Sequence, residues 1–494
     1  MSYIGLDVGT SGCKAAVFRE DGVLLSAHSR RYDLDFPQKG WVELNPNVVW
    51  TAVCAVLSDI APDAADARAI SVSSIGEALI FVDAQDKVLA NSIVYLDERC
   101  PEMVARVEAC FDPEALHHLT GVPINQMYSL CRYLWMREHA PHILERAKFC
   151  FLFGDYITYK LCGVRAIDPS TASRTMLFDV EKRRWAESLF DRIEIPILKF
   201  SPVCESGTQL HEICPEIASR CNLPSALQVV VGCHDQVAAT LGSGVLKSGE
   251  LLAGEGSSES LNLIVDAASI DMRTLFSKQI CLEPFVVPGT AILPIGQLSH
   301  GTCIKWFVQA HQSEYTVPGN APHTQYARAE ELCAEDCGEL LFLPYLSRSN
   351  CMDASSRAPA CFLGIDISTD VHKMYRAVLE GLAFESRMNF HLFADAGAHV
   401  DNITASGGGA QSERLMQIKA DVLGVCVTTL CTKEAGVAGL AMICARARAG
   451  IPYADAARQF VQTDRTFQPK RDYSSKFARY CHMNEVLKAL YRQI

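Results

Sequence analysis

Three short stretches rich in glycine and hydroxyl residues each lie next to a predicted strand, and they constrain the fold more than any other feature. They are GLDVGTSGCK at 5–14, GEGSSES at 254–260 and SGGGAQS at 406–412. Glycine lets the backbone approach a ligand closely, and Ser and Thr add hydrogen-bond donors, so such loops suit phosphate. One such loop alone is also typical of a hairpin turn or of a flexible turn before a helix. Three together favour two domains that share a nucleotide.

Apolar periodicity predicts the elements around these loops. YIGLDVG, AAVF and VLLSAHS predict an N-terminal hairpin meander, which strands at 69–74 and 78–82 continue. Residues 101–162 have helical periodicity. A second set of elements follows, and it repeats the order strand, Gly/Ser turn, strand or helix. Its predicted members are strands at 250–253 and 400–405 and a helix after SGGGAQS, and a strand at 228–231 with a glycine-closed helix after it precedes this set.

The length of the chain indicates more than one domain. At about 100–200 residues per domain, 494 residues favour two or more. We place the boundary near Val245–Gly249, which gives one domain at 1–245 and another at 246–494. The polar stretch Ser313–Cys337 has little periodicity, and we expect it to be a surface excursion.

Composition and charge exclude several classes of function. The net charge is −12 and no basic stripe with interleaved aromatic residues is present, so we expect no nucleic-acid partner. Asp7 interrupts the first apolar stretch and no basic region precedes it, so we expect no signal peptide. No uncharged apolar run reaches about 18 residues, so we expect no membrane span. The 21 cysteines form no CxxC pair and indicate free thiols in a reducing cytoplasm.

The first loop combines an acid with a cation. Lys14 would add a point charge for phosphate, whereas Asp7 would repel phosphate and suits Mg²⁺, held directly or through water. A solvated acid in a hairpin turn is the alternative role for Asp7.

The motif GCHDQ at 232–236 places an acid just after a buried strand. Asp235 could project from the strand end and take a proton from a substrate hydroxyl, as phosphoryl transfer needs. It could equally cap the following helix. Cys233 and His234 resemble metal ligands, but no other Cys/His pair has matching spacing, so a metal site of this kind is not favoured.

These stretches, taken in order, resemble the FGGY family of carbohydrate kinases, within the sugar kinase/Hsp70/actin superfamily. The resemblance covers nearly the whole chain and includes SSIGEAL at 73–79, DPSTASRTMLFD at 168–179 and RAVLEGLAFESR at 376–387. It implies an α/β fold with two ribonuclease-H-like (actin-like ATPase) domains and a deep cleft between them. The sugar would bind mainly to the N-terminal domain and ATP mainly to the C-terminal domain.

The resemblance also assigns site residues. It implies that Asp235 is the catalytic base and that Asp7 organises Mg²⁺, with both acids as metal ligands. Glu255 and Glu259 flank the second loop, where carboxylates beside a triphosphate are unfavourable unless they point away. The implied ATP-binding residues are Thr10, Ser11, Lys14, Gly256, Ser257, Gly301, Gly408 and Gly409.

The sugar end departs from the family's subgroups. Glu77 stands where xylulokinases have His, and Gly76 replaces the Arg of the Arg-Glu pair that glycerol kinases carry. Tyr95 stands where both usually have Trp, and Gln236 is glycerol-kinase-like. A carboxylate accepts several hydroxyl hydrogen bonds, so Glu77 suits a polyol or ketose, although a surface Glu in a turn is the alternative. We expect Gly76 to leave room for an acceptor longer than glycerol.

The sequence therefore predicts an ATP-dependent carbohydrate kinase. It would phosphorylate a primary hydroxyl of a ketopentose (xylulose- or ribulose-like) or of a four- to five-carbon sugar alcohol, with MgATP as donor. A non-catalytic ATP- and sugar-binding sensor or switch protein of the same superfamily is the alternative. The expected partner is a small sugar or polyol, and a homodimer is left open.

Overall fold

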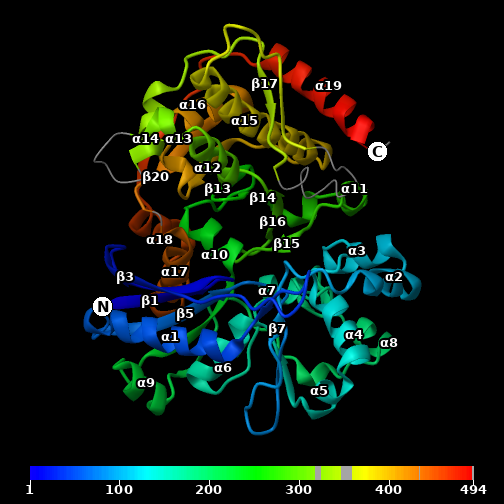
Figure 1. Cartoon of the computed structure of the whole chain (residues 1–494). Coiled ribbons are helices and arrows are strands. Elements are labelled where there is room, and N and C mark those ends of the chain that lie inside the picture. The colour runs from blue at the N-terminus through cyan, green and yellow to red at the C-terminus, as the bar shows by residue number, and fades with distance from the viewer. Residues whose placement is uncertain (317–323, 347–358, 433, 492–494) are drawn as a thin grey trace. The chain divides into compact units, whose positions relative to one another are not determined.

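The computed structural model describes residues 1–316, 324–346, 359–432 and 434–491 (Figure 1). The chain forms two compact units. The first unit contains Met1–Leu246, Asp266–Ile292 and Glu434–Gln462; the second contains Lys247–Val265, Leu293–Lys433 and Thr463–Ile494. The chain thus returns twice to the first unit after residue 246. A single domain boundary at 245/246 stays a prediction.

A six-stranded sheet forms the centre of the first unit. The predicted meander is confirmed, because its first three strands pair antiparallel in sequence order. The fourth strand, β5, was expected to continue the meander, but it pairs parallel to β1. The reason is a helix that the sequence reading missed, α1 (Pro46–Ile60), which carries the chain back across the sheet. The strand order is β11 (Gln209–Glu212), β12 (Gln228–His234), β5 (Ala67–Ser74), β1 (Ser2–Val8), β2 (Gly12–Arg19) and β3 (Leu24–Arg31).

Helices cover both faces of this sheet. In Figure 1, α17 (Ala435–Ala449) lies on one side of the blue strands and α1 on the other. The stretch 101–162 is helical as predicted, apart from the short strand β8. The remaining elements of this unit are β4 (Glu43–Leu44), β6 (Ile80–Val82), β7 (Ser92–Ile93), α2 (Pro101–Cys110), α3 (Pro113–Thr120), α4 (Ser129–His139), α5 (Pro141–Arg146), β8 (Phe149–Phe151), α6 (Phe153–Cys162), α7 (Pro169–Ser173), β9 (Phe178–Asp179), β10 (Arg184–Trp185), α8 (Glu187–Arg192), α9 (Pro215–Cys221), α10 (Asp235–Gly242), α11 (Met272–Lys278), β15 (Glu283–Pro284) and α18 (Tyr453–Phe460).

The second unit repeats the theme of strands joined by Gly/Ser turns. The strands predicted near 250 and 400 and the helix after SGGGAQS are confirmed as β13, β19 and α16. The sheet runs in the order β16 (Thr290–Gln297), β14 (Glu259–Asp266), β13 (Glu250–Glu255), β19 (Asn402–Ser406), β20 (Cys426–Leu430) and β21 (Thr463–Phe467). The helices are α12 (Gly301–Ala310), α13 (Gln312–Tyr315), α14 (Thr324–Leu332), α15 (Val371–Asp395), α16 (Glu413–Leu423) and α19 (Ser474–Tyr491).

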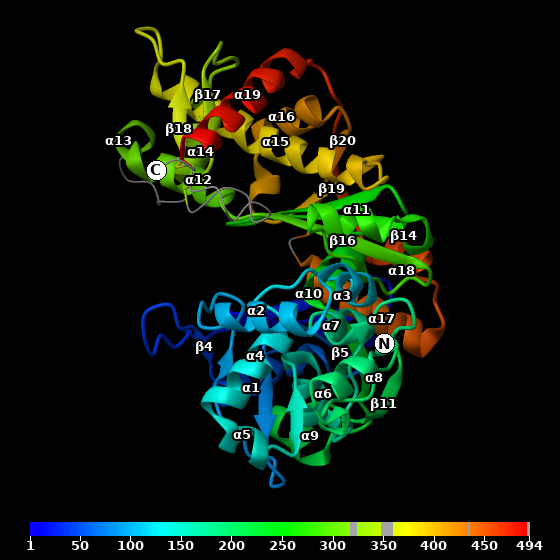
Figure 2. The ribbon, with the colours of Figure 1, turned by 90° about the vertical axis from the view of Figure 1, so that its right-hand side faces the viewer.

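Two further features of the second unit bear on earlier expectations. The stretch predicted as a surface excursion contains most of α13 and all of α14, and its residues 317–323 lie outside the described part of the chain. Figure 2 shows α19 beside the hairpin of β17 (Leu341–Leu343) and β18 (Cys361–Leu363). Among the described residues, no helix combines the length and the apolar character needed to cross a membrane.

Helix α17 packs against β1 and α10 with almost no space between the backbones. A Cβ added at Gly439 would lie 2.1 Å from the carbonyl oxygen of Ala238 in α10. Real Cβ atoms essentially never come that close to a backbone oxygen, so the helices could not keep this separation with any larger residue. Gly436, three residues earlier in α17, has open space around it.

We expect Gly439→Ala to lower the free energy of unfolding by about 1–3 kcal/mol, the usual cost of overpacking. The matched control is Gly436→Ala in the same helix, which should be neutral or stabilise by up to ~1 kcal/mol through helix propensity. Urea unfolding followed by circular dichroism measures both. Equal effects of the two substitutions would contradict the close packing of α17 on α10.

Candidate functional site

Asp7 is held at the C-terminal end of β1 by its neighbour in the sheet. Ser73 lies opposite it on β5, and the Ser73 hydroxyl donates a 2.6 Å hydrogen bond to Oδ1 of Asp7. Burial raises the pKa of Asp7 to about 6, and the negative charge of Asp235 adds to the rise. The structure therefore brings together the two acids that the sequence singled out.

Asp235 begins α10 directly after β12, so the strand-to-helix junction aims its side chain. His234, not Asp235, occupies the N-cap position, and no side-chain capping bond is present there. The helix-cap role considered for Asp235 is therefore wrong. Nε2 of His234 lies 3.2 Å from Oδ1 of Asp235, and Nδ1 of His234 lies 2.7 Å from Oε1 of Glu283. Burial alone would lower the pKa of His234, but the two carboxylates outweigh it and raise that pKa to about 9.

Glu77 is a buried residue with a left-handed backbone (φ +54°), not a surface residue in a turn. Nε of Arg174 donates a 2.7 Å hydrogen bond to Oε1 of Glu77, and a second guanidinium nitrogen lies 2.5 Å from the same oxygen. The Ser129 hydroxyl donates to the Glu77 carbonyl at 2.7 Å. The carboxylate is thus held in place on the same unit as Asp7 and Asp235.

The expectation that Gly76 leaves space for a longer acceptor is wrong. A Cβ at Gly76 would lie 2.7 Å from Cγ of Arg174, so the Arg174 side chain already fills that space. A guanidinium does lie beside Glu77, but it belongs to Arg174, the residue after α7. The sequence reading missed this because Arg174 is nearly a hundred positions from Glu77; its one signal was the Arg in DPSTASRTMLFD.

Two further predicted residues and one unpredicted residue surround this cluster. Tyr95 is half exposed, and the charges of Asp235 and Glu77 add to a rise in its pKa that burial causes first. Gln236 is the second residue of α10. Arg132 on α4 is fully buried, and its terminal nitrogens have no hydrogen-bond partner in the described part of the chain. Burial lowers the pKa of Arg132 to about 10, and the charge of Glu77 opposes the shift.

The first Gly/Ser/Thr loop lies between β1 and β2, where Thr10 and Ser11 form the turn. Lys14 is on β2 directly opposite Asp7, but its ammonium forms an ion pair with Glu434 at 2.9 Å. Lys14 is therefore not an unpaired cation in this loop, and its contact with phosphate stays a prediction.

The other predicted nucleotide residues line one pocket of about 670 Å³ in the second unit. Gly256, Ser257, Gly301, Gly408 and Gly409 come from three separate elements and meet there. Aromatic and polar side chains from α14 and α15 complete the wall, and a nucleoside has matching flat apolar and hydrogen-bonding surfaces. These additional residues include Tyr326, Glu330 and Tyr375.

The start of α12 anchors the second Gly/Ser loop. The N–H groups of His300, Gly301 and Thr302 donate to the carbonyl oxygens of Gly256 and Ser257 at 3.1 Å. A Cβ at Gly301 would lie 2.4 Å from the Gly256 carbonyl oxygen, so only glycine allows this approach. The first N–H groups of α12 are thus used to fix the loop.

Glu255 and Glu259 flank this loop, and both are buried in an ion-paired cluster. Nζ of Lys419 on α16 lies 2.5 Å from Glu255 and also pairs with Glu259, while Nε2 of His300 lies 2.6 Å from Glu255. The Ser386 hydroxyl donates to Glu259 at 2.8 Å. Although burial opposes it, the charges of Lys419 and His300 hold the pKa of Glu255 well below its usual value. Neither Glu255 nor Glu259 is therefore a free carboxylate beside the loop, because both are ion-paired with Lys419.

Glu255, Glu259 and His300 are also close enough together to hold a metal ion. The ammonium of Lys419 already provides a positive charge between the two carboxylates. Lys419 has no motif of its own, so sequence reading could not have identified it as the partner of either acid.

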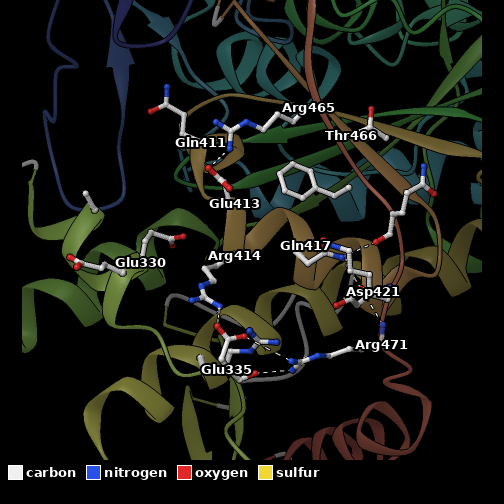
Figure 3. Close-up of a pocket in the computed structure, with 16 residues that line it drawn as sticks. Glu330, Glu335, Gln411, Glu413, Arg414, Gln417, Asp421, Arg465, Thr466 and Arg471 are labelled. Atoms are coloured by element: carbon white, nitrogen blue, oxygen red, sulfur yellow. Dashed lines mark hydrogen bonds and ion pairs between the residues drawn. The ribbon is translucent and has the colours of Figure 1, made fainter.

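A larger hollow of about 1220 Å³ shares Ala327, Glu330 and Gln411 with the nucleotide pocket (Figure 3). Acidic and basic side chains face each other across it in pairs. Arg414 binds Glu335, Arg465 binds Glu413, and Gln417 donates to Asp421 at 2.9 Å. The two Arg–Glu pairs balance each other's charge, whereas the Asp421 carboxylate is bound by a neutral amide.

We expect Lys419→Met to lower the free energy of unfolding by about 3–5 kcal/mol, because it leaves two buried carboxylates without a cation. Adding Glu255→Gln and Glu259→Gln to that variant should restore part of the loss. The exposed Lys39→Met is the control and should change stability by less than ~0.5 kcal/mol. Urea unfolding of the four proteins decides, and a small effect of Lys419→Met would contradict the pairing.

The comparisons with known proteins agree with this geometry. The N-terminal and C-terminal domain models of the FGGY family of carbohydrate kinases match residues 2–242 and 275–448. A xylulose kinase of Bacillus subtilis (strain 168) is 26% identical over 486 residues, which are 97% of this chain and 95% of that protein. A gluconokinase of the same strain is 25% identical over 503 residues, covering 99% and 97%.

Solved structures show the same fold. The crystal structure of xylulose kinase from Rhodospirillum rubrum has a TM-score of 0.87 at 25% identity, covering 100% of this chain and 99% of that one. Plasmodium falciparum glycerol kinase with ADP has a TM-score of 0.85 at 19% identity, covering 99% and 98%. The predicted α/β fold with two actin-like ATPase domains is confirmed. Since the two family models together match most of the residues, the chain belongs to the FGGY family of carbohydrate kinases.

Proposed function

We propose that this carbohydrate kinase transfers the γ-phosphoryl group of ATP to a primary hydroxyl of a neutral ketopentose or of a four- to five-carbon sugar alcohol, with Asp235 as general base. The observation that carries the proposal is a cluster of acids in which the charge of Asp235 raises the pKa of Asp7 and the charge of Glu77 raises the pKa of Asp235. ATP is the phosphate donor of FGGY kinases. A non-catalytic sensor is not favoured, because the curated relatives are named as kinases and the acidic cluster is complete.

Asp235 has the properties of a base for an alcohol. Burial raises its pKa, the charges of Glu77 and Glu283 raise it further, and His234 opposes the rise. A carboxylate with a raised pKa accepts a proton more readily than an exposed one. Its side chain remains about one quarter exposed (28%), so an acceptor hydroxyl could reach it.

Asp7 and Asp235 also form a suitable donor set for Mg²⁺. They are two carboxylates close enough for the charge of one to raise the pKa of the other, and hard oxygen ligands are those that Mg²⁺ prefers. When bound, Mg²⁺ would neutralise charge on the transferring phosphoryl group. Ser73 would keep Asp7 oriented for that role.

The nucleotide would bind in the second unit's pocket. Gly256 and Ser257 would lie against the phosphates, and Gly408 and Gly409 against the adenosine. Thr10, Ser11 and Lys14 would contribute from the loop between β1 and β2.

The charge of the acid cluster favours a neutral acceptor. Before Mg²⁺ binds, the four carboxylates Asp7, Glu77, Asp235 and Glu283 outnumber the cations Arg174, His234 and Arg132 by one. An aldonate, such as the gluconate implied by the gluconokinase relatives, would add another negative charge. The preference for five carbons rests on the relatives named xylulose kinase, since the argument from Gly76 is wrong.

We expect Asp235→Asn to lower kcat by ~10²-fold or more, the scale of losing a general base, while acceptor binding survives. The control is Glu205→Gln, which changes an exposed carboxylate paired with Arg183 and should leave kcat unchanged. A coupled assay of ADP release measures kcat, and calorimetry measures acceptor binding. Near wild-type turnover of Asp235→Asn would refute the assignment of the base.

The acceptor is tested by a kcat/KM series over glycerol, xylitol, ribulose, xylulose and gluconate. We expect a neutral five-carbon compound to rank first. Glu77→Gln should lower kcat/KM for that compound by about 1.5–3 kcal/mol, the range for a hydrogen bond to a charged group. First rank for gluconate or glycerol, or an unchanged series for Glu77→Gln, would show that this account of the acceptor site is wrong.

A further inference from the structure

A continuous chain of alternating charges joins Glu77 to Asp235 inside the first unit. Arg174 lies 2.7 Å from Glu77 and 3.9 Å from Oε2 of Glu283. Glu283 lies 2.7 Å from Nδ1 of His234, and Nε2 of His234 lies 3.2 Å from Asp235. The order is acid, cation, acid, cation, acid.

Nearly all of this chain is shielded from water. The residues Glu77, Arg174, Glu283 and His234 are each at most 8% exposed, and only the Asp235 side chain reaches solvent appreciably. Poor screening makes neighbouring charges interact strongly, and a buried charge that loses its partner is costly. The position of each member therefore depends on the next.

A single short helix, α7, supports the two cations of this series, Arg174 and His234. Arg174 follows α7 directly and packs over the ring of Tyr128 at 5.1 Å. Ser170 on α7 accepts a 2.9 Å hydrogen bond from the backbone N–H of His234. A shift of Arg174 would consequently be transmitted to His234 through the helix as well as through Glu283.

We propose that this series of five charged side chains couples recognition of the acceptor by Glu77 to the orientation of the Asp235 carboxylate. Arg174, Glu283 and His234 are then positioning residues, which act through their neighbours and do not touch the acceptor. His234 contacts carboxylates at both ring nitrogens, so it holds Oδ1 of Asp235 while Glu283 holds the ring. The inference rests on the proposed function, because it takes Asp235 as the base.

The test is a double-mutant cycle of Glu77→Gln and Glu283→Gln, two substitutions that keep side-chain size. We expect Glu283→Gln to lower kcat by about 10-fold or more while the acceptor dissociation constant, measured by calorimetry without nucleotide, changes less than ~3-fold. If the two sites are coupled, the fold-loss in kcat/KM of the double variant should be at least about 5-fold smaller than the product of the two single fold-losses.

His234 supplies a second, independent arm. His234→Gln retains an amide that can donate toward Asp235, whereas His234→Ala does not, so the Gln variant should keep several-fold more kcat at equal acceptor affinity. Calorimetry also gives the concentration of enzyme that can bind the acceptor, and dividing the rate by that concentration gives kcat per folded molecule. A lower kcat on this scale is then a loss of positioning and not a loss of folded enzyme. The surface variant Glu205→Gln should match wild type in every measurement.

The outcomes separate the two proposals. Single losses that multiply within about 2-fold, together with equal kcat for His234→Gln and His234→Ala, would overturn the coupling even if Asp235→Asn is inactive. Full activity of Asp235→Asn would instead overturn the proposed function.

Discussion

The close contact of α17 with the first unit is the constraint on which its site depends. Gly5 of β1 and Gly242 of α10 would each place a Cβ within 2.2 Å of a backbone oxygen of α17, at Val437 and Ala435. β1 carries Asp7 and α10 begins with Asp235, so one helix sets the position of both supports. α17 belongs to the segment Glu434–Gln462, with which the chain returns to the first unit after passing through the second. The acidic site is therefore complete only when this late part of the chain has docked.

Buried ion pairs organise both proposed binding regions. In each region they give buried charged groups a partner, without which burial would be costly. In the first unit, Arg174 and His234 keep three carboxylates of the acceptor region together. In the second unit, Lys419 forms ion pairs with two carboxylates that flank the loop expected to bind phosphate. Breaking a buried pair is far more costly than omitting it, so these clusters contribute more to a defined geometry than to net stability.

Much of the fold could be predicted because its signals are local. The period-2 strands at 2–31, the helical stretch at 101–162 and the strand-loop-helix order near 400–423 are all present. The missed helix α1 begins at Pro46 and is capped by Asn45, a signal that was available in the sequence. Because α1 was missed, β5 was predicted to pair as one more antiparallel hairpin strand. The crossover through α1 makes β5 run parallel to β1.

The candidate site divides in the same way. Residue type and position beside a strand were enough to single out Asp7 and Asp235, the family resemblance singled out Glu77, and glycine-rich turns were enough for the loops around Gly256 and Gly408. What surrounds them was decided by tertiary packing: Arg174 fills the space beside Gly76, Glu283 reaches His234, and Lys419 neutralises Glu255. Those partners are 49 to 164 residues apart in the chain. A sequence determines which groups can ionise and where turns occur, but the pairing of buried charges follows from distances that exist only once the sheets and helices have packed.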